Sequence, residues 1–184
     1  MDRLQELVSA GYTLVTWNGA SFDFFVLAQE SGRTEECGQL ALGHADLMVM
    51  VTFNKGYYLG LDKALAGAGL QGKVKNVTLR DGTILSNISS AQAPALWKAG
   101  EHEAVLAYLK GDVVQLLALA KVVERTRTIR WRSNRGKPQS VHLNKLMTVS
   151  ESFHIPAPDT SWMSNPPSRS SFVNWIPGWL DKVG

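Results

Sequence analysis

The sequence predicts an α/β fold in which short strands alternate with helices. Residues 12–17 are rich in β-branched and aromatic side chains, residues 44–49 are mostly apolar, and each run is followed by a segment with helical spacing. Strands that alternate with helices favour parallel pairing. The length of 184 residues suits one domain, or a compact domain with an appendage.

A short amphipathic helix opens the sequence. Its apolar face holds Leu4, Leu7 and Val8, and Gly11 is suited to end it because glycine adopts the left-handed conformation of helix stops. The first predicted strand, at residues 12–17, follows directly.

A turn connects this strand to the next helix. Asn18-Gly19 is a turn dipeptide, and Ser21 is a predicted N-cap for an apolar helix over residues 22–28. The resulting order is strand, turn and helix.

The second strand and the segment after it are less regular. We expect a buried strand at residues 44–49 and a helix over residues 61–68 that stops at Gly69. Residues 70–95 lack periodicity and are interpreted as a long functional loop, although residues 77–85 have the turn chemistry of a hairpin.

The clearest helix of the chain spans residues 101–125. Its apolar stripe consists of Val105, Leu109, Leu116, Leu119 and Val123. Residues 126–133 and 139–143 flank an Asn-Arg-Gly-Lys turn and predict a two-stranded ribbon. From Ile155 onward, five of the seven prolines and three of the six tryptophans lie in a tail with little regular pattern.

The composition divides the chain into residues 1–125 and residues 126–184. The first part holds 11 basic and 13 acidic side chains, whereas the second holds eight and three, so the basic excess lies at the C-terminal end. No apolar run is long enough to cross a bilayer, and a single cysteine, Cys37, excludes an internal disulfide. We expect a globular protein of the reducing cytoplasm without a membrane partner.

Two acidic residues are set into apolar surroundings. Helix geometry turns Asp112 toward the apolar side of its helix, with Tyr108 one turn earlier on the same face. A tyrosine hydrogen bond to aspartate at the edge of a core explains this pair without any activity. Asp23 begins the helix after the first strand, where an acid also stabilises a helix N-terminus.

Taken together, the two acids indicate a cation site. Two inward carboxylates at a sheet edge are what hard cations such as Mg²⁺ or Mn²⁺ require. His44 and Asp46 share one face of the second strand, and we interpret that histidine as structural. No glycine-rich phosphate loop and no Ser-His-Asp or Cys-His arrangement is found.

The order of these segments resembles a known family. Residues 15–23, Val-Thr-Trp-Asn-Gly-Ala-Ser-Phe-Asp, are similar to the second motif of the DEDD superfamily of ribonuclease H-like 3′-5′ exonucleases, which includes polymerase proofreading domains. Residues 108–112, Tyr-Leu-Lys-Gly-Asp, resemble the third motif of its tyrosine-containing branch. Residues 44–48, 69–73 and 96–100 follow in matching order, so the resemblance covers residues 4–125.

The resemblance implies a two-metal phosphodiesterase. Asp23 and Asp112 would hold Mg²⁺ or Mn²⁺, and Tyr108 would orient the attacking water. Asn18 and Phe22 would line the groove for the terminal nucleotide; as a turn former and a core residue they have an equally good structural explanation. The substrate would be single-stranded or frayed DNA or RNA.

The sequence departs from the family at its start. The family's first motif, Asp-x-Glu on the first strand of the sheet, has no counterpart ahead of Leu4, and Asp2 and Glu6 have the wrong spacing. We therefore expect an N-terminally incomplete ribonuclease H-like exonuclease fold: a fragment, half of a split assembly, or a degenerate relative. Its open strand edge, at residues 12–17, would accept the missing strands from another chain or segment. The alternative function is an inactive module that binds nucleic acid or completes another protein's sheet.

The ribbon carries a separate signal for nucleic acid. Residues 125–150 contain seven basic side chains and no acidic one. Period-two geometry places Arg130 and Arg132 on one face, with Arg135 and Lys137 at the turn. A basic strand face suits a phosphate backbone, and Trp131 on the other face is either core or a stacking platform. The alternative is a solvated edge protected by charge.

Overall fold

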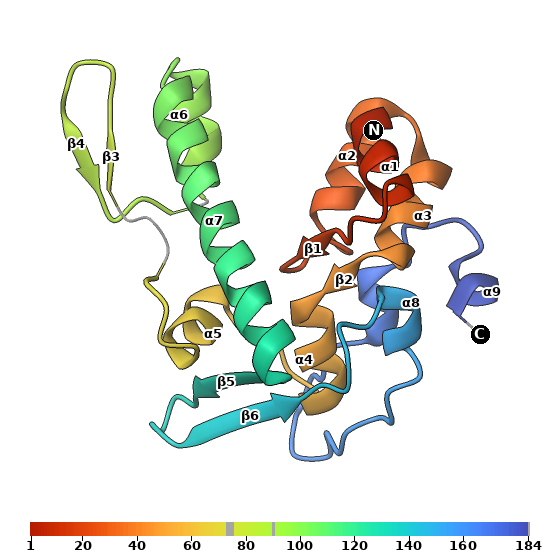
Figure 1. Ribbon diagram of the computed structural model, residues 1–184. Coiled ribbons are helices and arrows are strands. Elements are labelled where there is room, and N and C mark those ends of the chain that lie inside the picture. The colour runs from red at the N-terminus through yellow and green to blue at the C-terminus, as the bar shows by residue number, and fades with distance from the viewer. Residues whose placement is uncertain (73–75, 90, 184) are drawn as a thin grey trace.

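The computed structural model describes residues 1–72, 76–89 and 91–183 and has a mixed α/β architecture (Figure 1). The elements up to the middle of the chain are α1 (Asp2–Ser9), β1 (Val15–Thr16), α2 (Asp23–Ser31), α3 (Thr34–Gly43), β2 (Ala45–Asp46), α4 (Leu47–Lys55), α5 (Leu61–Gly67), β3 (Asn76–Thr78) and β4 (Ile84–Ser86). The remaining elements are α6 (Ala93–Lys98), α7 (His102–Thr126), β5 (Thr128–Arg132), β6 (Pro138–His142), α8 (Val149–Ser152), the 3-10 helix η1 (Arg169–Phe172) and α9 (Trp179–Val183). The predicted α/β class is confirmed at this level.

Two of the three strand pairs agree with the sequence predictions. β1 and β2 pair in parallel, with Thr16 opposite Asp46. β5 and β6 form the predicted antiparallel ribbon. β3 and β4 form a hairpin where residues 77–85 have the turn chemistry for one, although residues 70–95 are interpreted from the sequence as a long loop. The segment interpreted as a loop thus contains a hairpin; its residues 73–75 and 90 lie outside the described residues, as does Lys73 of the resemblance.

The second predicted strand is wrong beyond its first residues. Only Ala45–Asp46 is strand, and α4 begins at Leu47, where the Asp46 carboxylate caps the helix by accepting from the backbone N–H groups of Met48 and Val49. Seven of the nine α4 residues are buried. A short helix that is apolar all round has no helical period, so its pattern cannot be told from that of a buried strand.

Two further details of this region differ from the predictions. Ser21 does not cap α2: the helix begins one residue after Phe22, and the Ser21 hydroxyl donates to Asn18 Oδ1 at 2.7 Å. The strand predicted at residues 12–17 pairs only over Val15–Thr16, because its partner β2 has just two residues.

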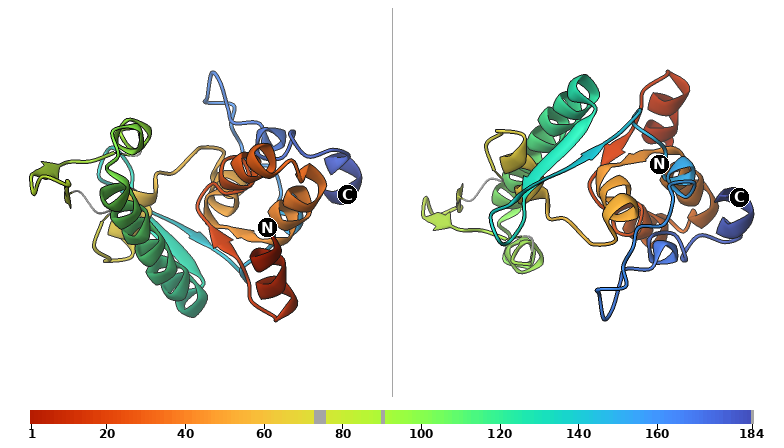
Figure 2. Two further views of the ribbon diagram at one scale, coloured as in Figure 1. Left: turned by 90° about the horizontal axis from the view of Figure 1, so that it is seen from above. Right: turned by 90° about the horizontal axis from the view of Figure 1, so that it is seen from below.

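The longest helix, α7, lies where the sequence predicts it. Val105, Leu119 and Val123 of the predicted stripe are buried, but Leu109 is 48% exposed. α7 runs between two parts of the molecule, with the β3–β4 hairpin on one side and α1, α2 and β1 on the other (Figures 1 and 2).

Two large apolar clusters form the core. One joins α4, α5 and α7 to the inner face of the ribbon, where Ile129 and Trp131 are buried. Trp131 is therefore a core residue rather than a stacking platform. The other cluster joins α2, α3 and α4 to the tail through Phe172, Val173 and Ile176.

The tail is held by hydrogen bonds as well as by apolar packing. The Arg169 guanidinium donates to four backbone carbonyls, those of Phe53, Phe153, Ile155 and Pro156. Its carbon lies 4.7 Å from the centre of the Phe53 ring. Burial lowers the pKa of Arg169, and the carbonyl oxygens replace the water that this cation has lost.

Candidate functional site

The turn after β1 rests on one buried carboxylate. Asp46 is 1% exposed. Its Oδ1 accepts from the backbone N–H of Asn18 at 2.9 Å, in addition to those of Met48 and Val49, and its Oδ2 accepts from Ala20 N at 3.0 Å. Four backbone donors therefore fix the β1–α2 turn onto the start of α4. Because both oxygens are engaged, the role of Asp46 is structural.

His44 is a second structural group beneath this turn. Its ring nitrogens lie 2.7 Å from Thr16 Oγ1 and 2.7 Å from the carbonyl oxygen of Ala41, and the side chain is buried against the Phe24 ring. Burial lowers the pKa of His44, although the negative charge of Asp46 opposes the effect. This arrangement agrees with the interpretation of His44 as structural.

Asp23 lies at the surface as the first residue of α2. The chain around it removes water, which raises the pKa of the Asp23 carboxyl, and the negative charge of Asp46 raises it further. Both effects disfavour the ionised form of the Asp23 carboxylate.

Tyr108 and Asp112 occupy successive turns of α7. Tyr108 is 2% exposed and packs with Val77 and Ile88 beneath the β3–β4 hairpin. Asp112 is half-buried, and its Oδ1 atom is inaccessible to solvent. The hairpin and α2 lie on opposite sides of α7 (Figure 1). The acid whose charge raises the pKa of Asp23 is Asp46. The structure thus packs Tyr108 with the hairpin and places Asp23 beside Asp46.

The described residues do not by themselves make the two-metal site that the resemblance implies. Within residues 1–72, 76–89 and 91–183, no three His, Cys, Asp or Glu side chains are grouped so as to hold a metal ion. A two-metal centre built on Asp23 and Asp112 would need additional carboxylates.

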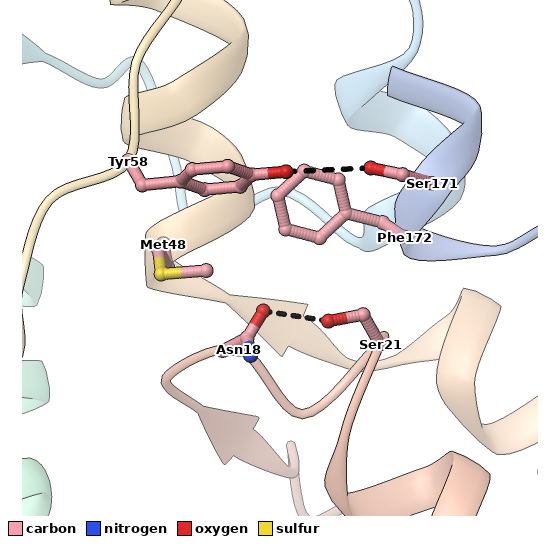
Figure 3. A pocket seen from close by; sticks show the side chains of 6 residues that line it. All are labelled: Asn18, Ser21, Met48, Tyr58, Ser171 and Phe172. Atoms are coloured by element: carbon pink, nitrogen blue, oxygen red, sulfur yellow. Dashed lines mark hydrogen bonds between the residues drawn. The ribbon is translucent and has the colours of Figure 1, made fainter. Parts of the chain in front are cut away.

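Asn18 lines a pocket that the sequence did not predict (Figure 3). The pocket has a volume of about 470 Å³. Its lining residues come from the β1–α2 turn, α4, the segment after α4, and η1: Asn18, Ser21, Met48, Tyr58, Ser171 and Phe172. Asn18 also forms the predicted turn, at a φ of 71°. Phe22 is neither core nor pocket lining, because it is 61% exposed.

The basic face of the ribbon is open to solvent. Arg130 and Arg132 are exposed while Ile129 and Trp131 are buried, as the period of two predicted. Arg135 and Lys137 are exposed at the turn. None of these four cations has an ion-pair partner among the residues that the structure describes.

The ribbon is seated by backbone contact with α5. A Cβ atom on Gly67 would lie 1.8 Å from the carbonyl oxygen of Arg130, so only glycine allows this approach. The contact fixes the basic face relative to the core.

The side of α7 that faces away from the core is apolar and exposed. Its five large apolar side chains are each between 48% and 64% exposed: Leu106, Leu109, Val113, Val114 and Leu117. β1, which contacts α7, pairs with β2 and with no other strand in the described part of the chain. An unpaired strand edge and an uncovered helix face therefore belong to neighbouring elements.

Comparison with known proteins gives no assignment: no family model matches the chain, and no curated protein or solved structure was found to match it. Across the described residues, no helix combines the length and apolar character needed to span a membrane.

Proposed function

We propose that this chain is a module of a metal-dependent 3′-5′ exonuclease that acts on single-stranded or frayed DNA or RNA. The proposal includes a ribonuclease H-like fold, Mg²⁺ or Mn²⁺ as cofactor, and a covering segment that brings further carboxylates. The observation that carries it is the edge of β1 that no described strand pairs with, near the uncovered apolar face of α7, with Asp23 at the start of α2, the helix that follows β1. A strand added to β1 would lie over α7 and beside Asp23.

The acids have different positions in this proposal. Asp23 lies at the surface, where a bound cation would offset the effects that raise the pKa of its carboxyl. Asp112 lies on α7, one turn after Tyr108. Tyr108 takes the role that the resemblance implies only if the hairpin moves, because its side chain is buried beneath β3 and β4.

A second candidate function is favoured by the same surface. Five exposed apolar side chains on one helix are more than a surface helix ordinarily carries. A module without catalysis that completes the sheet of another protein would also use this face. Both functions need a segment or partner that covers the apolar face of α7. An assay of nucleic acid hydrolysis distinguishes them, because only the exonuclease cleaves nucleic acid.

We propose that the basic face of the ribbon binds the phosphate backbone of the nucleic acid. Replacing Arg130, Arg132 and Arg135 by Gln should weaken single-strand binding and flatten its salt dependence by about 0.7 units of slope per lost phosphate contact. A control with the same charge change replaces the exposed Arg3, Lys98 and Lys121 by Gln. An equal change of slope in both variants would leave the ribbon without a specific role.

The catalytic proposal is tested by hydrolysis in Mn²⁺ of one single strand labelled at its 3′ end and of the same strand labelled at its 5′ end. The chain alone should release little label, and addition of a strand segment carrying Asp-x-Glu should release 3′ label as mononucleotide while 5′-labelled products shorten stepwise. Asp23→Ala and Asp112→Ala should each abolish the gain. Absence of cleavage in the completed mixture would favour the binding module.

A further inference from the structure

The basic face of the ribbon is one side of a regular antiparallel strand pair. β5 and β6 pair over five residues each, and Arg130 lies opposite Ser140 at the centre. Ile129, Trp131 and Val141 are buried in the core, so the outer face carries the alternate positions: Thr128, Arg130, Arg132, Pro138, Ser140 and His142. Figure 1 shows the ribbon at the lower edge of the molecule, with α5 and α7 above it. The outer face is therefore accessible to a partner.

This face offers hydrogen-bond donors and carries no negative charge. None of its side chains is acidic. Neither the Arg130 guanidinium nor the Ser140 hydroxyl forms a hydrogen bond or an ion pair with another described residue. Exposed cations flank the face at both ends, with Arg127 before β5 and with Arg135 and Lys137 at the turn. The arrangement suits a ligand that has hydrogen-bond acceptors in the middle and phosphates on either side.

The composition of the outer face does not suit a single strand. Sites for single strands combine positive charge with aromatic rings on which the bases stack. The strands of the ribbon contain one such ring, that of Trp131, and it is 3% exposed on the inner face. The outer face holds no Phe, Tyr or Trp side chain, so it provides no stacking platform for unpaired bases.

The ribbon has a shape that fits a groove of duplex DNA. Two antiparallel strands lie about 4.8 Å apart, and the major groove of B-form DNA, about 12 Å wide, admits a two-stranded ribbon. Arg130 and Ser140 would then face the base edges, where guanine presents its O6 and N7 acceptors to an arginine fork. The major groove of an RNA duplex is too deep and narrow for side chains to read the bases. The shape therefore favours DNA over RNA.

The ribbon is also held in one position on the core. The close approach of Gly67 to the carbonyl oxygen of Arg130 seats β5 on α5. Lys63, on the same helix, donates from its Nζ atom to Asn134 Oδ1 in the turn of the ribbon. A surface that is already ordered loses little conformational freedom when it binds, which favours a specific fit.

We infer that the basic face of the ribbon lies in the major groove of duplex DNA. Arg130 and Ser140 contact base edges, while Arg127, Arg135 and Lys137 contact phosphates at the two ends of the ribbon. The inference rests on the proposed function in taking the ribbon as the contact with nucleic acid. It makes the substrate a DNA duplex with a frayed end, rather than RNA or a free single strand.

The test is the binding of the full chain to labelled oligonucleotides, measured by fluorescence anisotropy in EDTA so that hydrolysis plays no part. The probes share one guanine-containing sequence: a DNA duplex closed by a loop at each end, one strand of it alone, the corresponding RNA duplex, and the same DNA duplex with a glucosylated hydroxymethyl group on C5 of its cytosines. The glucose fills the major groove and leaves the phosphate charge unchanged. The unmodified DNA duplex should bind at least tenfold more tightly than each of the other three probes.

The variant Arg130→Lys separates the base contact from the charge. Lysine keeps the positive charge but lacks the planar fork that matches O6 and N7 of guanine. Binding of the DNA duplex should weaken about fivefold or more, and binding of the single strand should not change. The matched control is Arg135→Lys, which should leave both affinities unchanged because lysine also binds phosphate. Both arginines are exposed, so both variants should fold.

Three results would each overturn the inference: equal affinities for the DNA duplex and the single strand, tight binding of the glucosylated or the RNA duplex, or an unchanged duplex affinity in Arg130→Lys. If single-strand binding nevertheless required Arg130, Arg132 and Arg135, the ribbon would keep its proposed contact with phosphates. The failure of the inference would then be distinct from that of the proposed function. Absence of binding to every probe would overturn both the inference and the proposed role of the ribbon.

Discussion

Helices α4 and α7 both carry many apolar side chains, but α4 is largely buried and α7 is largely exposed. Seven of the nine residues of α4 are buried, whereas only six of the 25 residues of α7 are. The cover of α4 comes from α2, α3 and the tail on one side, through residues such as Phe153 and Phe172, and from α5, α7 and the ribbon on the other. α7 is covered on one side by α5, the ribbon and the hairpin, and its other side is exposed.

The difference shows that α4 is buried by other described residues, whereas the outer face of α7 is not. Full burial of a large apolar side chain stabilises the folded state by about 1.5–3 kcal/mol. The side chains of α4 contribute this stabilisation, whereas the exposed side chains on the outer face of α7 do not. A partner that covers α7 would realise it, and the neighbouring β1 edge offers backbone groups for the same partner.

The largest expected difference between the two helices is the loss of stability when a buried side chain of α4 and an exposed side chain of α7 are each truncated to alanine. Phe53→Ala in α4 should lower the free energy of unfolding by about 3–5 kcal/mol, because the ring is 1% exposed and packs on Phe153 and Phe172. Leu117→Ala in α7 should cost less than about 0.5 kcal/mol, since its side chain is 54% exposed. Urea unfolding of both variants measures the difference, and similar losses would contradict the comparison.

A smaller effect is expected at the start of α4. Asp46→Ala removes the acceptor of four backbone N–H groups and should cost roughly 3 kcal/mol, the sum of a lost helix cap and unsatisfied buried donors. The β1–α2 turn should loosen at the same time, seen as faster amide exchange at Asn18 and Ala20. Retention of slow exchange there would show that the turn is held by other contacts.

The electrostatic effect at Asp23 should be smaller still and depends on pH. The folded chain raises the pKa of Asp23 above 3.8, so the folded state binds the proton more tightly than the unfolded state. The contribution of this group to stability is therefore full at low pH and is lost as pH rises through the folded pKa. The stability of Asp23→Asn relative to the natural chain should increase from pH 3.5 to pH 7.

The exposed acid Glu30, on the same helix, provides the control for this measurement. Glu30→Gln should show no comparable increase over the same pH range. A stability difference for Asp23→Asn that does not change with pH would mean that the surroundings of Asp23 do not disfavour its charge.

Elements with local signals could be predicted from the sequence. The stripe of α7, the turn chemistry of the hairpin and the alternation of Ile129, Arg130 and Trp131 in the ribbon all depend on neighbours a few residues away. The parallel pairing of β1 and β2 followed from the order of strands and helices. The residues at which β1 and β2 end could not be predicted in this way, because the number of paired residues depends on the length of the partner strand.

The remaining features depend on distant contacts. Residues 47–49, the first turn of α4, are predicted as strand because α4 is apolar on all sides, although the aspartate directly before this apolar run, Asp46, is an N-cap signal. The pocket could not be predicted, since Tyr58 and Ser171 meet only in the folded chain. The exposure of Leu109 was missed because a helical stripe does not reveal whether something covers it.

The most direct test of the open α7 face is the free energy of unfolding of one variant, Leu109→Gln with Val113→Gln and Leu117→Gln, measured in urea. All three side chains are between 48% and 64% exposed, and glutamine is a good helix former. We expect the free energy of unfolding to stay within about 1.5 kcal/mol of that of the natural chain. A loss of about 6 kcal/mol or more, as expected for three buried side chains, would show that this face is already covered.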